Sequence, residues 1–151
     1  MKNISYHYTE CGLDNIYLIN GFNQFETPYG RAISINDIDG LHRAIGVLLI
    51  TTIKDLSGTE IRFLRHEMLM SQKTLSSLLG VGEQEVRRWE NGKIKMPKPS
   101  ESLLRLLYRE HIHDRKSKIA SILKAISDLE AGISENQFVF KDTKNGWQAA
   151  A

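Results

Sequence analysis

Hydrophobic positions change their spacing along the chain and divide it into three regions. Residues 1–57 mix short β-prone runs with one stretch at helical spacing. Residues 58–114 carry hydrophobic residues three and four positions apart, between residues that begin or end helices. Residues 115–151 hold one amphipathic stripe and a short apolar run. The pattern predicts a mainly α protein: a helical bundle with a small α+β N-terminal region and a C-terminal amphipathic helix.

The first region is expected to form strands before its helix. Ile16–Ile19 is a β-prone run that ends at the turn dipeptide Asn20-Gly21. Phe22–Phe25 and Ala32–Ile35 flank a Pro-x-Gly turn, which predicts a hairpin. Asn36 or Asp37 can then cap a helix. The predicted buried face of that helix is Leu41, Ala44, Ile45 and Leu48.

Start and stop signals predict several helices in the second region. Ser71 can cap one helix, and Gly80 can end it because glycine adopts the left-handed conformation at low cost. Another helix is predicted from about Gly82 to Asn91, and Ser100 is expected to cap the one after it. The residues predicted to be core are Ile61, Leu64, Met68, Leu75, Leu78, Val86, Trp89, Leu103, Leu106 and Leu107.

The third region is predicted to contain one amphipathic helix, which Gly132 ends. Gln137–Lys141 is a strand candidate, and the tail around Trp147 is expected to fray. The helix either packs on its own bundle or forms a dimer interface, for which the N-terminal unit is the other candidate. Its apolar stripe is Ile119, Ile122, Leu123, Ile126 and Leu129.

Charge is distributed unevenly between these regions. Residues 58–116 hold twelve basic and eight acidic residues, although the whole chain has a net charge of only +2. A basic segment is typical of a protein that binds a polyanion, and it is also compatible with a solvated basic face.

The spacing between Ser71 and Gly92 predicts a helix-turn-helix unit, in which the second helix buries one face and presents the other to the DNA major groove. Ser-Gln-x-x-Leu, Gly-Val and Val-x-x-Trp-Glu-x-Gly-x-x-x-x-Pro resemble the Cro/repressor-type (Xre-like) helix-turn-helix domain over about residues 58–110. The resemblance implies a five-helix bundle that binds operators as a homodimer. Gly82 departs from the family, which usually has a Ser or Thr cap there.

A second resemblance concerns the N-terminal region. Tyr6-x-Tyr8-x-x-Cys11-Gly12-Leu13 is similar to the start of MqsA/YgiT-type antitoxins, in which two Cys-x-x-Cys pairs bind zinc. Because Cys11 is the sole cysteine, a four-thiolate site is impossible here, and we expect a metal-free relative. The resemblance implies an antitoxin that binds a toxin and represses its own operon. The aromatic N-terminal residues could form the toxin-binding surface or the core of their own small fold.

Candidate base-reading residues lie on the predicted outer face of the helix after Gly82. Gln can pair bidentately with adenine and Arg with guanine, whereas Glu83 could accept from cytosine or repel phosphate. Arg87 could reach a base or the backbone. The candidates are Glu83, Gln84, Arg87 and Arg88. A solvated face, with Glu85 and Arg88 paired along the helix, is the alternative.

Phosphate contacts are expected on both sides of this helix. Side chains and N–H groups at a helix start can meet one phosphate, and lysines beyond a helix end can hold the backbone. Such contacts fix the register and make binding depend on salt, but they carry no sequence information. The candidates are Gln72, Thr74, Asn91, Lys93 and Lys95.

An enzyme is not expected. The chain has no P-loop, dinucleotide-binding loop or His-Glu-x-x-His motif, and no catalytic residue is assigned. We expect no metal site and no cofactor. The pair His111 and His113 would point in different directions on a helix, and Cys11 with His7 matches no standard ligand spacing.

No apolar stretch is long enough to span a membrane, and Met1–His7 lacks a signal-peptide core, so a cytoplasmic protein is expected. The sequence predicts a DNA-binding transcriptional regulator: a repressor that acts as a homodimer on a palindromic operator of double-stranded DNA. It is a candidate for the autoregulating antitoxin of a toxin–antitoxin operon. The alternative is a protein-interaction module that neutralises a toxin and binds DNA only secondarily.

Overall fold

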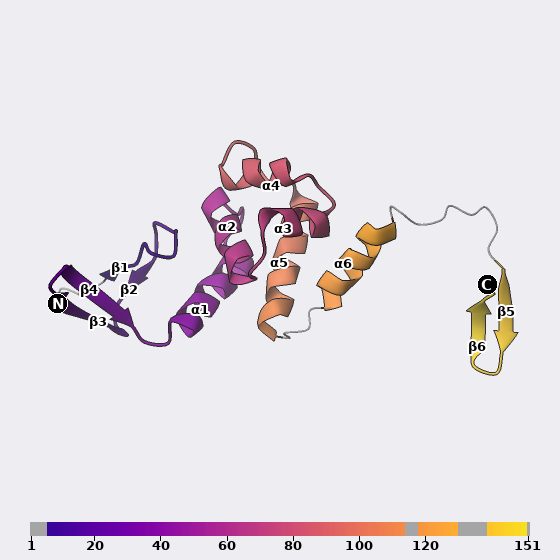
Figure 1. Cartoon of the computed structure of the whole chain (residues 1–151), viewed down its shortest axis with the longest axis horizontal. Coiled ribbons are helices and arrows are strands. Elements are labelled where there is room, and N and C mark those ends of the chain that lie inside the picture. Colours follow the sequence, from indigo (N-terminus) through magenta and orange to yellow (C-terminus); the bar gives the residue numbers. More distant parts are fainter. Residues whose placement is uncertain (1–5, 114–117, 130–138, 151) are drawn as a thin grey trace.

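A computed structural model describes residues 6–113, 118–129 and 139–150 (Figure 1). The boundary expected at 114/115, the stop at Gly132 and the residues Gln137 and Phe138 lie outside this range. The helices are α1 (Ile38–Thr51), α2 (Gly58–Glu67), α3 (Gln72–Leu79), α4 (Glu83–Glu90), α5 (Lys98–His113) and α6 (Lys118–Asp128). The strands are β1 (Tyr6–His7), β2 (Tyr17–Leu18), β3 (Phe22–Thr27), β4 (Gly30–Ile35), β5 (Phe140–Thr143) and β6 (Gly146–Ala149). The prediction of a mainly α protein with a helix-turn-helix unit is confirmed.

The strands form three separate antiparallel pairs, β1–β2, β3–β4 and β5–β6. The predicted hairpin around Pro28 is confirmed, with Phe22 opposite Ile35 and Thr27 opposite Gly30. Gly30 closes the turn at a φ of 115°, which L side chains rarely adopt.

Side-chain caps at Asp37 and Ser71 begin two helices where the sequence predicts them, and a third cap at Ser57 was not predicted. Asp37 caps α1 by accepting from the N–H of Gly40. Ser57 and Glu60 form a capping box at α2, and Ser71 accepts from the N–H of Thr74 at α3. These caps satisfy donors that a helix start otherwise leaves free.

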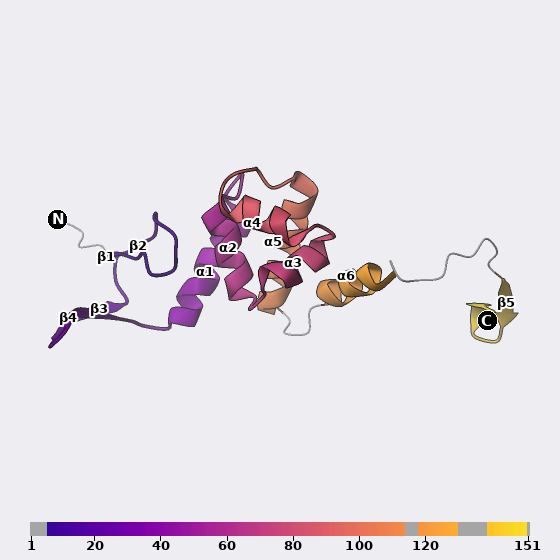
Figure 2. The same cartoon turned by 45° about the horizontal axis from the view of Figure 1, so that its top comes forward.

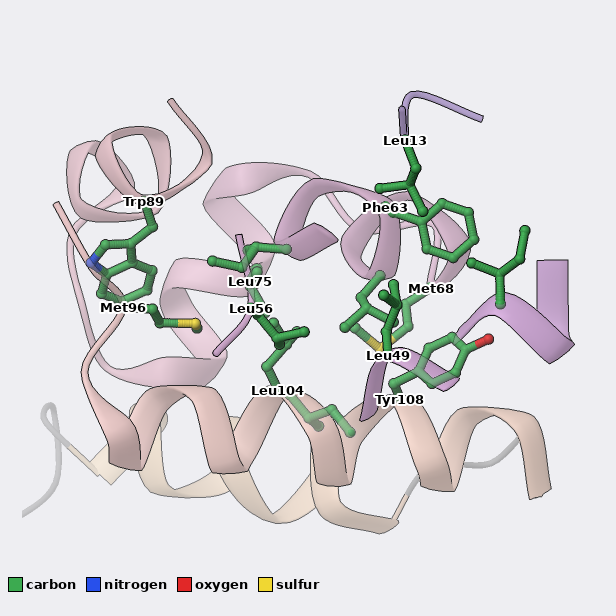
Figure 3. Close-up of a cluster of buried hydrophobic side chains, with 14 of the residues drawn as sticks. Leu13, Leu49, Leu56, Phe63, Met68, Leu75, Trp89, Met96, Leu104 and Tyr108 are labelled. Carbon is green, nitrogen blue, oxygen red and sulfur yellow. The ribbon is translucent and has the colours of Figure 1, made fainter. Parts of the chain in front are cut away.

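The core lies where α1, α2 and α5 pack together and continues under α3 and α4 (Figure 3). Leu49 of α1, Leu75 of α3, Trp89 of α4 and Leu104 of α5 belong to one buried cluster. The hydrophobic core therefore crosses the expected boundary at residue 57.

Two predicted helix faces are correct at some positions and displaced by one residue at others. In α1, Ile45 is buried as predicted, but Ala44 and Leu48 are exposed and Leu49 is buried instead. In α5, Leu103 is only half-buried and Leu106 is 50% exposed, whereas Leu104 is fully buried. Periodicity cannot choose between neighbouring leucines, and packing against the facing helix makes the choice.

The predicted cap of α5 at Ser100 is wrong, because the helix already begins at Lys98. Pro99 lies in the first turn, where its missing N–H removes no helical hydrogen bond. The N–H of Glu101 donates to the carbonyl of Pro97 at 2.9 Å and closes the first turn.

The predicted C-terminal helix is present as α6, which packs against α3 and α5. Ile119 and Leu123 face the core, whereas Ile122, Ile126 and Leu129 are exposed. The tail does not fray as expected, because β6 pairs with β5 in a hairpin and Asp142 lies opposite Trp147. Both views place this hairpin apart from the helices (Figure 2).

The N-terminal unit, which is the segment before α1, packs on α1 and α2 through a series of hydrogen bonds and several apolar side chains. The Nε2 atom of His42 lies 2.7 Å from the Tyr8 hydroxyl, and its Nδ1 atom lies 2.8 Å from a carboxylate oxygen of Glu67. A carboxylate can only accept, so Nδ1–H of His42 donates to Glu67, and the Tyr8 hydroxyl and Nε2 share the second hydrogen bond. Burial raises the pKa of Tyr8, and the nearby Cys11 and Glu10 raise it further.

The aromatic residues of this region divide between core and surface. Tyr8 is buried, and Tyr6 and Phe22 pack partly against the core with ring centroids 5.5 Å apart. Tyr17, Phe25 and Tyr29 are exposed. The expectation of a core for the N-terminal fold therefore holds for Tyr6, Tyr8 and Phe22, whereas the expectation of a toxin-binding surface stays a prediction.

Candidate nucleic-acid interface

Helix α4 follows α3 after a tight turn at Gly80, whose φ of 69° lies in the left-handed region. Gly82 occupies the N-cap position with an ordinary extended backbone (φ −76°, ψ 153°) and makes no side-chain cap. The start of α4 therefore has regular geometry without the Ser or Thr that the resembled family usually has there.

Helix α4 has one buried and one exposed face. Val86 and Trp89 are buried in the core. The four candidate base-reading residues, Glu83, Gln84, Arg87 and Arg88, are all exposed. The structure thus brings these predicted residues together on one solvent-facing surface.

The charged side chains on this surface are paired with one another. Nη1 of Arg88 donates to Oε1 of Glu85 at 3.1 Å, and Nη2 of Arg87 lies 3.7 Å from Oε1 of Glu83. The pairing of Glu85 with Arg88, weighed as an alternative from the sequence, is present. All four side chains are between 41% and 53% exposed, so solvent weakens these pairs.

A buried ion-pair network fixes α4 on the bundle. The carboxylate of Glu90 has no exposed surface and accepts two bonds from Arg65 of α2, at 2.7 and 2.8 Å. Arg62 and Gln72 each donate to the same carboxylate at 3.3 Å. Burial by itself would raise the pKa of Glu90, but the hydrogen bonds and charge of Arg65, with the bonds from Gln72 and Arg62, hold it below its usual value.

Sequence reasoning missed this network, because a charged residue gives no sign of burial in a hydrophobicity pattern. Its signal in the sequence is Trp89-Glu90, where the acid directly follows a core aromatic residue.

The candidate phosphate contacts flank α4, and several already have intramolecular partners. Thr74, Asn91, Lys93 and Lys95 are exposed. Lys95 pairs with Asp55 of the α1–α2 connection at 3.2 Å, and the Thr74 hydroxyl accepts from Ser71. Gln72 is half-buried through its bond to Glu90. The Gln72 amide nitrogen thus uses one of its two N–H donors on Glu90.

The histidines and Cys11 do not form a metal centre in the part of the chain that the structure describes, where no three possible ligands cluster. His42 is engaged by Tyr8 and Glu67, and His7 bonds the carbonyl of Asp14 at 2.6 Å. Cys11, His42 and His66 line a cavity of about 390 Å³ beside the N-terminal unit. No helix within the described ranges is long and apolar enough to cross a membrane.

Comparison with known proteins identifies the central segment. Residues 61–105 match the model of a helix-turn-helix family, and this segment runs from α2 into α5. No curated protein and no solved structure matches the chain at a significant level. The chain contains a helix-turn-helix domain of the kind found in DNA-binding regulators, and the resemblance to MqsA/YgiT-type antitoxins stays a prediction.

Proposed function

We propose that this protein is a sequence-specific DNA-binding transcriptional regulator, a repressor that acts as a homodimer on a palindromic operator in the cytoplasm. The observation that carries the proposal is the two-faced helix α4. Its buried residues Val86 and Trp89 anchor it, and its opposite face carries the side chains that pair best with base edges. The protein has no enzymatic role in this proposal.

Each exposed residue of α4 has its own role in DNA binding under this proposal. Arg88 donates to guanine N7 and O6, and Gln84 pairs with adenine, each worth about 1–3 kcal/mol of discrimination. Glu83 accepts from a cytosine amino group, and Arg87 supports a base or backbone contact. Contacts to phosphate set the register of α4 in the groove. They come from Gln72, Thr74, Asn91, Lys93 and Lys95.

The test is fluorescence anisotropy on duplexes obtained by selection from a random-sequence pool with the full chain. A scrambled duplex of equal length and composition is the control, at two salt concentrations. We expect binding to the selected duplex to be at least about 10³-fold tighter. Equal, weak binding to both duplexes, or failure of the selection to converge, would contradict the proposal.

The homodimer is proposed to form through α6. Ile122, Ile126 and Leu129 lie three and four residues apart and stay exposed after Ile119 and Leu123 have packed on the bundle. A two-fold dimer that binds one DNA face needs its recognition helices about 34 Å apart, with half-sites one helical turn apart. A palindrome with this spacing in the selected duplexes would support the dimer.

A second candidate function is binding of a protein partner, which would be the toxin if the protein is an antitoxin. Phe25 is 50% exposed and Tyr29 is fully exposed on the β3–β4 hairpin, where aromatic side chains are typical of protein interfaces. Co-purification with the product of a neighbouring toxin-like gene, lost on Tyr29→Ser, would support this role. Unchanged recovery of that product with Tyr29→Ser would remove the hairpin from the interface.

A further inference from the structure

The guanidinium of Arg88 is held from one side by a carboxylate of its own helix. Among the described residues, Arg88 donates to Glu85 through Nη1 at 3.1 Å, and no other contact of the guanidinium is recorded. An arginine has five N–H donors in a fixed planar fork, so one bond from Nη1 leaves the Nε–Nη2 edge available. That edge presents two parallel donors, the pattern that guanine N7 and O6 accept.

We propose that Glu85 is a positioning residue for recognition: it holds Arg88 so that the Nε–Nη2 edge of the guanidinium faces a guanine. The inference rests on the proposed function of α4 and adds a residue that itself touches no base. Glu85 lies three residues before Arg88 on α4, so its carboxylate is in reach of the guanidinium throughout one helical turn, and the two side chains are 41% and 52% exposed.

The pair affects binding to random DNA through charge. Non-specific affinity comes from phosphates neutralised by free basic groups, with the release of their counterions. The exposed face of α4 carries Glu83 and Glu85 against Arg87 and Arg88, so its charges cancel. The helix that enters the groove therefore adds little to binding at random sequences, and the flanking lysines supply that binding.

The pair affects binding to the operator because it restricts the Arg88 side chain before DNA is bound. An unpaired arginine must lose side-chain rotamer freedom when it meets a base, and this cost opposes binding. Because Glu85 already restricts Arg88, part of that cost is met in the free protein. The carboxylate keeps its bond to Nη1 while the other edge meets guanine. The cancelled charge on α4 and the restricted Arg88 side chain therefore both raise the ratio of specific to non-specific affinity.

A helix-stabilising role for Glu85 is the alternative, because the residue lies in the first turn of α4, where a negative charge is favourable. Such a role would act on folding and would affect all duplexes alike. Binding measured on two duplexes, together with the melting temperature of each variant, separates the two roles.

The experiment measures the affinity of the full chain for a duplex selected by the wild-type protein and for its scrambled counterpart. For Glu85→Ala we expect the specificity ratio to fall about two- to fivefold, the range that an exposed ion pair can supply. The affinity for scrambled DNA should rise, and its salt slope should steepen by up to about one unit. Glu85→Gln keeps an acceptor for Nη1, so its affinity for the selected duplex should stay nearer to wild type.

Two controls decide whether Glu85 acts through Arg88. Glu26→Ala changes the net charge equally and removes a comparable exposed pair with Arg31 on the β3–β4 hairpin, so its specificity ratio should not change. In the background of Arg88→Ala, the further change Glu85→Ala should leave the ratio unaltered. A fall of the same size without Arg88, or an equal change on both duplexes, would overturn the proposal. If the wild-type protein shows no sequence preference, the proposed function itself fails. This outcome differs from a failure of the Glu85 proposal, in which the wild-type protein still prefers the selected duplex.

Discussion

Val86 and Arg88 lie two positions apart on α4, yet one is fully buried and the other is half exposed. The difference follows from helix geometry, because residues two apart point to different sides. Val86 and Trp89 hold the helix in place by packing, so the exposed residues between them are free to contact DNA. Under the proposed function, stability and recognition therefore depend on different residues of the same short helix.

This separation predicts the outcome of Arg88→Ala. Affinity for the selected duplex should fall by about 1–3 kcal/mol, whereas affinity for scrambled DNA should change much less, because a base contact contributes only at the correct sequence. Arg31→Ala on the hairpin is the matched control. Equal losses on both duplexes in anisotropy titrations would reduce Arg88 to a phosphate contact.

Lys93→Ala should behave in the opposite way. Lys93 is exposed directly after α4, and a phosphate contact carries no sequence information. Affinity for both duplexes should fall alike, and the slope of log K against log salt should become less negative by about one unit. Titrations at four salt concentrations measure this slope, and an unaltered slope would remove Lys93 from the phosphate contacts.

At the scale of elements, the position of α4 depends on the carboxylate of Glu90. This residue accepts hydrogen bonds from side chains on α2 and α3, so three helices meet at one buried group. Removing one partner of a buried pair leaves an uncompensated charge and costs about 3–5 kcal/mol. The network therefore positions the exposed face of α4, which is the proposed recognition surface.

The lowered pKa of Glu90 predicts a pH-dependent stability. A carboxylate with a lower pKa in the folded state contributes stability above its unfolded pKa, and this contribution is lost as pH falls through the folded value. Glu90→Gln should therefore destabilise the protein strongly at pH 7, and the difference from wild type should shrink below about pH 4. Urea unfolding at several pH values measures this, with Glu26→Gln as the surface control. A difference that stays constant into acid would contradict the assignment.

At the scale of the whole molecule, α1 belongs to the helical bundle although it lies outside the matched segment. Ile45 and Leu49 are buried in the same cluster as Leu104 and Leu107. Nη1 and Nη2 of Arg105 donate to carbonyls at the end of α1 and just beyond it, including Leu49 and Ile53 at 3.0 and 2.8 Å. A cation at a helix C-terminus satisfies carbonyls that the helix leaves free.

A fragment of residues 58–114 should therefore not fold stably. It lacks the core residues of α1, and each large buried aliphatic side chain that is lost costs about 2–5 kcal/mol. We expect no cooperative thermal transition by circular dichroism for this fragment, whereas the full chain should melt cooperatively. A transition of 58–114 at the temperature of the full chain would show that the domain is independent of α1.

The dimer proposal makes a prediction at the same scale. Ile126→Asp places a charge in the exposed stripe of α6 and should shift the full chain from dimer to monomer in size-exclusion chromatography with light scattering. Leu69→Asp, at an almost fully exposed residue of the α2–α3 turn, is the control. A wild-type protein that is already monomeric at micromolar concentration, or a variant that stays dimeric, would contradict an interface on α6.

The sequence by itself determined the elements that depend on local chemistry. Ser71, Gly80 and Asn91 mark the bounds of α3 and α4 because capping and left-handed backbone act between residues close in the chain. The exposure of Arg88 opposite Val86 follows from the helical period in the same way. These local signals were sufficient to locate the helix-turn-helix unit and the exposed face of α4.

Tertiary structure decided whatever depends on residues far apart in the chain. Leu49 is buried rather than Leu48, and Leu104 rather than Leu103. Each pair consists of two adjacent leucines, so the facing helix decides which one is buried. Glu90 became a buried anchor because Arg65, 25 residues away, reaches it in the fold. A hydrophobicity pattern records how residues repeat along one helix, whereas burial of a charge requires a partner from another helix.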